Sequence, residues 1–164
     1  MRRVPAALIA CALGVLIAGC GGAGVSSGAT VSVYVSAPMR GPEGKAGRGL
    51  CAGAREEVAR AGGVAGDVRV RVVCLDASGP GGGWTLARVG ADARRAVEDS
   101  TAVAYIGEPD RGARRQSRPI VEAAEVAEIA GYRGAAAMGQ ILRAIDGAGS
   151  EAPREAVFNN AGGR

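Results

Sequence analysis

Hydrophobic positions along the chain alternate between runs typical of strands and spacings typical of helices. Three β-branched or apolar runs predict strands, at residues 30–36, 68–75 and 101–107. Two intervening segments, residues 45–61 and 84–99, carry apolar residues at helical spacing. The inward stripes are predicted to be Leu50, Cys51, Ala54, Val58 and Ala61 in the first helix, and Leu86, Val89, Ala93 and Val97 in the second. Gly62 and Gly63 follow the first helix and are expected to end it.

This alternation of strands and helices predicts an α/β fold, in which helices flank a parallel sheet and the crossovers are right-handed. In such sheets ligands bind at the carboxyl ends of the strands. Three loops lead away from that edge, at residues 38–44, 76–83 and 108–114. We therefore expect the three loops to converge on one binding site.

The second of these loops contains the run Gly79-Pro80-Gly81-Gly82-Gly83, which invites comparison with a phosphate-binding loop. The run lacks the Gly-Lys-Ser/Thr ending and the G-x-G-x-x-G spacing that bind phosphates in known nucleotide sites. We interpret it as a flexible connector, with nucleotide binding as the weaker alternative.

The N-terminus predicts export. Met1-Arg2-Arg3 is basic, and residues 4–17 form an apolar stretch of 14 residues. This is shorter than the about 20 residues that a membrane-spanning helix needs, and it is typical of a secretory signal peptide. Leu16-Ile17-Ala18-Gly19-Cys20 resembles the lipobox of bacterial lipoproteins, in which the cysteine is acylated. The alternative is an ordinary signal peptide with a chance cysteine.

We therefore expect residues 1–19 to be removed and Cys20 to anchor the protein on the extracytoplasmic face of the cell membrane. Residues 20–29 are rich in Gly and Ser and are predicted to be a flexible tether. After processing, Cys51 and Cys74 are the cysteines of the folded part, in an oxidising compartment. Two states stay open for this pair, a disulfide or two buried free thiols.

Composition narrows the function classes. The chain of 164 residues has no histidine, which excludes Ser-His and Cys-His catalysis and histidine-based metal sites. Removal of Arg2 and Arg3 with the signal leaves 18 of 20 basic residues against 16 acidic ones, too even a balance for nucleic-acid binding. Asp76, Glu108 and Asp110 are predicted to share one sheet edge, but no nucleophile-base pair accompanies them. We predict a non-enzyme without metal or cofactor.

Three segments in order carry a family resemblance: VYVSAPMRGPEGKAGRGLCAGAREEVARAGGVAG, VRVRVVCLDAS and ARRAVEDSTAVAYIGEPDRGA. They resemble the first lobe of type I periplasmic binding proteins, in particular the branched-chain amino-acid group of substrate-binding lipoproteins that serve ABC importers. The shared features are a strand followed by Pro-x-x-Gly, a helix ending in Ala-Gly-Gly, a strand ending in Asp and a strand ending in Ile-Gly. The resemblance covers residues 31–124 and implies a receptor that closes two lobes on a small solute, such as an amino acid, and delivers it to a permease.

The resemblance also implies which residues contact the solute. These are Pro38 and Gly41 in the first loop, and Asp110, Arg111, Gly112 and Ala113 in the third. In the family, small or hydroxyl residues of the third loop bind the amino-acid carboxylate. Gly112 and Ala113 fit that pattern, whereas Arg111 and Arg114 do not. An arginine either binds a carboxylate through two hydrogen bonds or belongs to a solvated basic face, and we favour the basic face.

The chain departs further from the family after residue 124. The family continues with a fourth strand and a second lobe. In this chain the middle of the family sequence is expected to be missing, as if it had been cut out between about residue 126 and residue 131. Residues 140–149 and 152–158 resemble the two C-terminal helices that return to the first lobe. We therefore divide the chain into a first-lobe α/β domain, residues 30–130, and a C-terminal helical segment, residues 131–164. The family-like order places the first strand between the second and third. It leaves the third strand at an edge unless the segment after Val126 or another chain covers it.

The predicted function is a substrate-binding lipoprotein related to ABC importers of branched-chain amino acids or similar small solutes, truncated and weak or inactive in binding. Its expected partners are a small-molecule solute, an ABC permease if it functions in import, and the membrane through the lipid anchor. The alternative is a non-transport lipoprotein, or a decayed remnant, that uses the first lobe as an interaction module.

Overall fold

The computed structural model describes residues 28–131 and 133–162, so the predicted signal peptide and Cys20 lie outside the described residues. The elements follow the order β1 Thr30–Ala37, α1 Gly44–Arg60, β2 Val64–Ala65, β3 Val68–Asp76, α2 Leu86–Glu98, β4 Ala102–Gly107, α3 Arg111–Glu122, β5 Ala127–Ala130, α4 Gly134–Ala148 and α5 Pro153–Asn160. The three predicted strands and two predicted helices are all present, with bounds within two residues of the expected ones.

Five strands of the described chain form one sheet in the order β2-β3-β1-β4-β5. Strands β3, β1, β4 and β5 are parallel, which confirms the α/β fold and the position of the first predicted strand between the other two. The two-residue β2 was not predicted and pairs antiparallel with β3. It directly follows Gly62 and Gly63, whose φ angles of 71° and 81° turn the chain after α1.

The third predicted strand is not the sheet edge, because the segment after Val126 covers it, which is one of the alternatives that the sequence left open. Strand β5 pairs parallel with β4 in the register Ala104↔Ala127 to Gly107↔Ala130. Its sequence, Ala-Glu-Ile-Ala, has little strand propensity of its own. The unpaired backbone groups of β4 supply the pairing, and Glu125 at φ 56° reverses the chain between α3 and β5.

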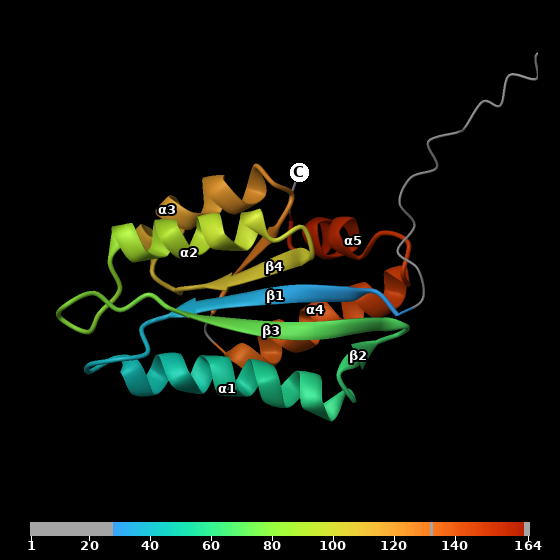
Figure 1. The fold of residues 1–164 in the computed structure, drawn as a ribbon, viewed down its shortest axis with the longest axis horizontal. Coiled ribbons are helices and arrows are strands. Elements are labelled where there is room, and N and C mark those ends of the chain that lie inside the picture. Colours follow the sequence, from blue (N-terminus) through green and yellow to red (C-terminus); the bar gives the residue numbers. More distant parts are fainter. Residues whose placement is uncertain (1–27, 132, 163–164) are drawn as a thin grey trace, which may run out of the picture.

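Helices cover both faces of the sheet (Figure 1). Helices α1 and α4 lie on one face, where the larger core cluster joins strand valines to Ile141, Ile145 and Val157. Residues of α4 and α5 therefore share a hydrophobic core with residues 30–130. Helices α2 and α3 lie side by side on the other face, against Tyr34, Leu75 and Tyr105. None of the described helices is long and apolar enough to cross a membrane.

Strand β1 is buried on both faces. Valines alternate along it with serine and tyrosine, so one face is apolar and the other carries hydroxyl groups. Val31, Val33 and Val35 belong to the cluster beneath α1 and α4. The alternating residues Ser32, Tyr34 and Ser36 are also buried, and each finds a polar partner. The Tyr34 hydroxyl donates to Asp99 at 2.8 Å, the Ser36 hydroxyl donates to Asp92 at 2.7 Å, and the Ser32 and Thr101 hydroxyls lie 2.7 Å apart. These pairings allow a polar strand face to be buried without loss of hydrogen bonds.

The predicted helix stripes need two corrections. Ala61 is exposed because α1 ends at Arg60 and the chain turns away at Gly62. Leu86 is 54% exposed because α2 begins there, capped by the Thr85 hydroxyl, and this first residue does not reach the sheet. Val89 and Ala93 are buried as expected, and Ala96 is buried beside the half-buried Val97.

A disulfide joins Cys51 of α1 to Cys74 of β3, with the two Cα atoms 6.1 Å apart. Both residues belong to or pack against the core cluster beneath α1 and α4. Of the two states left open by the sequence, the structure has the bonded one.

Candidate groove at the carboxyl edge of the sheet

The first two predicted loops meet at the carboxyl ends of β1 and β3. The backbone N–H of Met39 donates to the Asp76 carboxylate and to the Ser78 hydroxyl, each at 2.9 Å. Asp76 also accepts from the Ser78 N–H at 2.9 Å and from the Arg40 guanidinium at 2.7 Å. Burial opposes ionisation of Asp76, but these hydrogen bonds outweigh it and hold its pKa well below the usual range. Asp76 thus acts as the clamp that fixes both loops.

A groove of about 620 Å³ lies beside this clamp, between the loop after β1, the loop after β4 and the start of α4. Its walls are formed by residues from four parts of the chain: Ala37, Pro38, Glu43, Ala46, Gly47, Gly49, Leu50, Trp84, Glu108, Pro109, Asp110, Gly131, Arg133 and Gly134. The loops at residues 38–44 and 108–114 thus line one groove. The loop at residues 76–83 is joined to the first of them by Asp76 but lines a different cavity, and only Trp84, directly after it, reaches the groove.

Three carboxylates, Glu43, Glu108 and Asp110, line this groove together with the cation Arg133. Burial, together with the nearby charges of Glu43 and Asp110, raises the pKa of Glu108 to about 7. Glu108 Oε1 is buried and has no hydrogen-bond partner among the described residues. No cluster of three acidic or cysteine side chains in residues 28–131 and 133–162 has an arrangement that holds a metal ion.

The structure places the solute contacts predicted from the sequence in different parts of the molecule. Pro38 and Asp110 line the groove, whereas Gly41 lines a second cavity on the far side of the first loop. Ala113 is fully buried against Ala77 and Val89, so its side chain faces the core. Arg111 is exposed on α3 and does not line the groove.

Asp110 is the N-cap of α3, and this role changes what the loop offers a solute. Its carboxylate accepts from the backbone N–H of Gly112 at 2.6 Å and of Ala113 at 3.2 Å. These N–H groups, free at the start of an uncapped helix, are the donors that attract an anion. In this chain they are already occupied by the protein's own carboxylate.

The arginines of α3 form a separate basic face. Arg111, Arg114, Arg115 and Arg118 line a surface hollow of about 510 Å³ with Pro119 and Glu122. Arg118 donates to Glu122 at 2.7 Å, and Arg111, Arg115 and Arg118 are exposed. The opposite side of α3 carries Ala113, Ser117 and Val121 into the protein. The preference for a basic face over a solute contact therefore agrees with where these side chains lie.

Sequence reasoning did not name Glu43, Trp84 or Arg133 as part of the groove. Trp84 was placed at the start of a helix, but it lies in the loop before α2. Arg133 reaches the groove because the segment between β5 and α4 passes the same sheet edge, which depends on the unpredicted β5. The available signal was the position of Glu43 in the predicted loop at residues 38–44, which leads away from the same sheet edge.

No protein-family model matches the chain, and no curated protein matches it. Solved structures do match. A leucine-binding protein LivK from Thermotoga maritima MSB8 is 25% identical over 61% of this chain and 27% of its own, with a TM-score of 0.51. An ABC transporter solute-binding protein from R. palustris, in complex with 4-hydroxybenzoate, is 23% identical over 62% of this chain and 26% of its own, with a TM-score of 0.54.

This chain has a type I periplasmic-binding-protein fold. A possible leucine/isoleucine/valine-binding protein from Rhodopirellula baltica SH 1 shares it, with 16% identity over 71% of this chain and a TM-score of 0.51. The chain spans between 26% and 31% of the length of these three proteins, which fits part of a two-lobed receptor. The first two are binding proteins for small solutes, and the third is a possible one.

Proposed function

We propose that this chain is a solute-binding lobe related to the receptors of ABC importers and that its solute lies in the groove at the carboxyl edge of the sheet. The convergence of the loops after β1 and β4 on this groove, together with Trp84 from the segment before α2, carries the proposal, because ligands of parallel α/β sheets bind at that edge. The proposed solute is a small molecule such as a branched-chain amino acid or an aromatic acid. An ABC permease is the proposed partner in import.

We further propose that binding by this chain alone is weak. The described residues form one side of an open groove, whereas receptors of this fold close a hinge around the ligand. An open groove stays wet, and polar interactions lose strength in the high dielectric of water. The acidic lining adds a specific obstacle, since Glu43 and Asp110 oppose the approach of a solute carboxylate.

Calorimetric titration of the purified mature chain with leucine, isoleucine, valine and 4-hydroxybenzoate tests both statements. We expect millimolar affinity at best. Asp110→Asn keeps a capping side chain but removes its charge, so it should tighten binding of these carboxylates severalfold. Asp67→Asn, an exposed change in the turn between β2 and β3, is the matched control and should leave binding unchanged. Micromolar binding by a monomeric wild type with a cooperative melt would contradict the weak-lobe proposal.

A second candidate is a non-transport lipoprotein, or a remnant, that uses this lobe as an interaction module. It is favoured by the capped N–H groups of Gly112 and Ala113, which leave the groove without its expected carboxylate donors. The same titration separates the two candidates. Absence of binding in both the wild type and Asp110→Asn favours the interaction module.

The proposed location is the extracytoplasmic face of the cell membrane, with a lipid on Cys20. The lipobox-like segment that ends at Cys20 supports it. Metabolic labelling with a palmitate analogue in bacteria should label the wild type and not Cys20→Ala. Equal labelling of the two proteins would show that the anchor is elsewhere or absent.

A further inference from the structure

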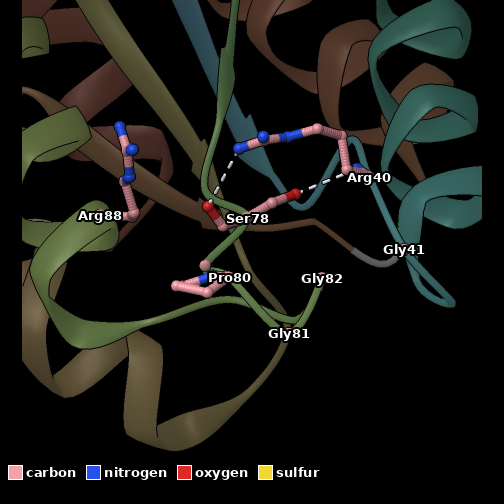
Figure 2. A pocket seen from close by; sticks show the side chains of 8 residues that line it. Arg40, Gly41, Ser78, Pro80, Gly81, Gly82 and Arg88 are labelled. Atoms are coloured by element: carbon pink, nitrogen blue, oxygen red, sulfur yellow. Dashed lines mark hydrogen bonds between the residues drawn. The ribbon is translucent and has the colours of Figure 1, made fainter.

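A second cavity of about 430 Å³ lies on the other side of the loop after β1 and shares no lining residue with the groove (Figure 2). It is formed by the loop after β1, the glycine-rich loop after β3 and the first turn of α2. The residues that line it are Arg40, Gly41, Ser78, Gly79, Pro80, Gly81, Gly82 and Arg88. Among the described residues, its charged side chains are two arginines from different elements, which gives it the opposite charge to the acidic groove.

Arg40 is held in place by the clamp that joins the two loops. Its Nε donates to Asp76 at 2.7 Å, its Nη2 lies 3.4 Å from the Ser78 carbonyl oxygen, and its backbone N–H donates to the Ser78 hydroxyl at 3.0 Å. Figure 2 shows the side chain extended toward Ser78, with the two bonds between Arg40 and Ser78 as dashed lines. Nη1 has no hydrogen-bond partner among the described residues, and the side chain remains 65% exposed. A guanidinium oriented in this way has donors left for an anion.

Arg88 approaches the same cavity from α2. It is exposed and makes no side-chain hydrogen bond within the described part of the chain. Asp92, one turn further along α2, attracts it electrostatically, but the Asp92 carboxylate is half-buried and accepts from the Ser36 hydroxyl at 2.7 Å. Arg88 therefore keeps its full set of donors for a ligand.

Glycines form much of the wall between the two arginines, beside Ser78 and Pro80. Gly41 and Gly82 have φ angles of 68° and 85°, and a Cβ built on Gly82 would lie 2.6 Å from the Gly41 Cα. The two loops are thus in direct backbone contact, and Gly82 is buried. The glycine-rich run was interpreted as a flexible connector, yet it is packed against the first loop. Glycine at these positions also lets a ligand approach the main chain closely.

We propose that this cavity binds a small oxyanion, a phosphate or carboxylate group, between Arg40 and Arg88. Guanidinium groups bind such anions through paired charge-assisted hydrogen bonds, and arginines on two sides of one cavity provide them from two directions. The wall bears no acidic side chain; Asp76 lies behind it and is already bonded to Arg40. The site is separate from the solute groove, so the proposal stands independently of the proposed function.

Titration of the full mature chain with inorganic phosphate and, separately, with succinate tests the proposal, with ionic strength held constant by sodium chloride. We expect saturable binding of at least one anion, and the stronger of the two identifies the ligand chemistry. Arg88→Gln should weaken it about tenfold, as the loss of a charge-assisted hydrogen bond predicts. Arg115→Gln removes the same charge from the α3 face and should leave binding unchanged.

A change at Gly81 provides a second test that does not depend on arginine. A Cβ on Gly81 meets nothing within 4 Å, so Gly81→Ala and Gly81→Asp are both expected to fold. Gly81→Asp places a carboxylate on the cavity wall and should abolish anion binding, whereas Gly81→Ala should retain it. The proposal is overturned if neither anion binds saturably, if Arg115→Gln weakens binding as much as Arg88→Gln, or if Gly81→Asp binds like Gly81→Ala.

Discussion

The disulfide between Cys51 and Cys74 provides a direct test of what stabilises the fold. The two cysteines are 23 positions apart and link α1 to β3 across the core. The chain-entropy model assigns a crosslink over this separation about 3 kcal/mol of stabilisation, by restricting the unfolded chain. Cys51→Ala with Cys74→Ala should therefore lower the free energy of unfolding by about 3 kcal/mol. For a domain of this size that corresponds to a fall in Tm of about 10 °C.

Thermal unfolding followed by circular dichroism, with and without a reductant, measures this effect. The mature chain with Cys20→Ala is the reference, so that Cys51 and Cys74 are its remaining cysteines. Reductant should lower the Tm of this reference. It should leave unchanged the Tm of the variant that carries Cys51→Ala and Cys74→Ala in addition to Cys20→Ala. Titration of two free thiols in the unreduced reference, or a Tm insensitive to reductant, would refute the bonded state and the stabilisation inferred from it.

Two further predictions concern the groove and the packing of α1. The raised pKa of Glu108, about 7, means that the folded state keeps a proton that the unfolded chain releases near 4.5, so stability should fall as pH rises through this interval. Glu108→Gln should reduce that fall, as measured by urea unfolding at pH 4.5 and above pH 7; an unchanged pH dependence would contradict the assignment. Gly47→Ala would place a Cβ 1.8 Å from the Pro38 carbonyl oxygen and should cost about 1–3 kcal/mol by overpacking. Gly49 lies two residues further along the same helix, and a Cβ added there meets nothing within 4 Å, so Gly49→Ala should stabilise the protein by about 0.5–1 kcal/mol. Equal urea midpoints for the two variants would show that the close approach at Gly47 is not real.

Local sequence was sufficient wherever one element's own pattern decides its conformation. The β-branched run of β1 and the apolar run of β4 are strands because residues buried on both faces of a parallel sheet are apolar or small in succession. The inward stripe of α1 and its glycine ending were also predictable, because helical periodicity and the left-handed conformation are local properties. The order of the central strands followed from the family-like arrangement of these elements.

Tertiary structure decided what depends on pairing between distant segments. Strand β5 exists because β4 offers an unpaired edge, not because Ala127–Ala130 favours a strand by itself. The same strand directs the chain so that Arg133 and Gly134 reach the groove from beyond the three predicted loops. Periodicity within a segment carries no information about such partners, which is why the fourth parallel strand was missed.

The chemistry of the candidate sites was likewise predictable only in part from the sequence. From its sequence the chain was expected to place Asp76, Glu108 and Asp110 at one sheet edge, since each follows or lies close to the end of a strand. Only the folded chain separates their roles. Asp76 clamps two loops, Asp110 caps α3, and the buried Oε1 of Glu108 has no hydrogen-bond partner among residues 28–131 and 133–162. The backbone contact between Gly41 and Gly82 likewise turns two separate loops into one cavity wall. Residue type sets the chemistry available, but burial and neighbouring donors determine which carboxylate is neutralised, bonded or free.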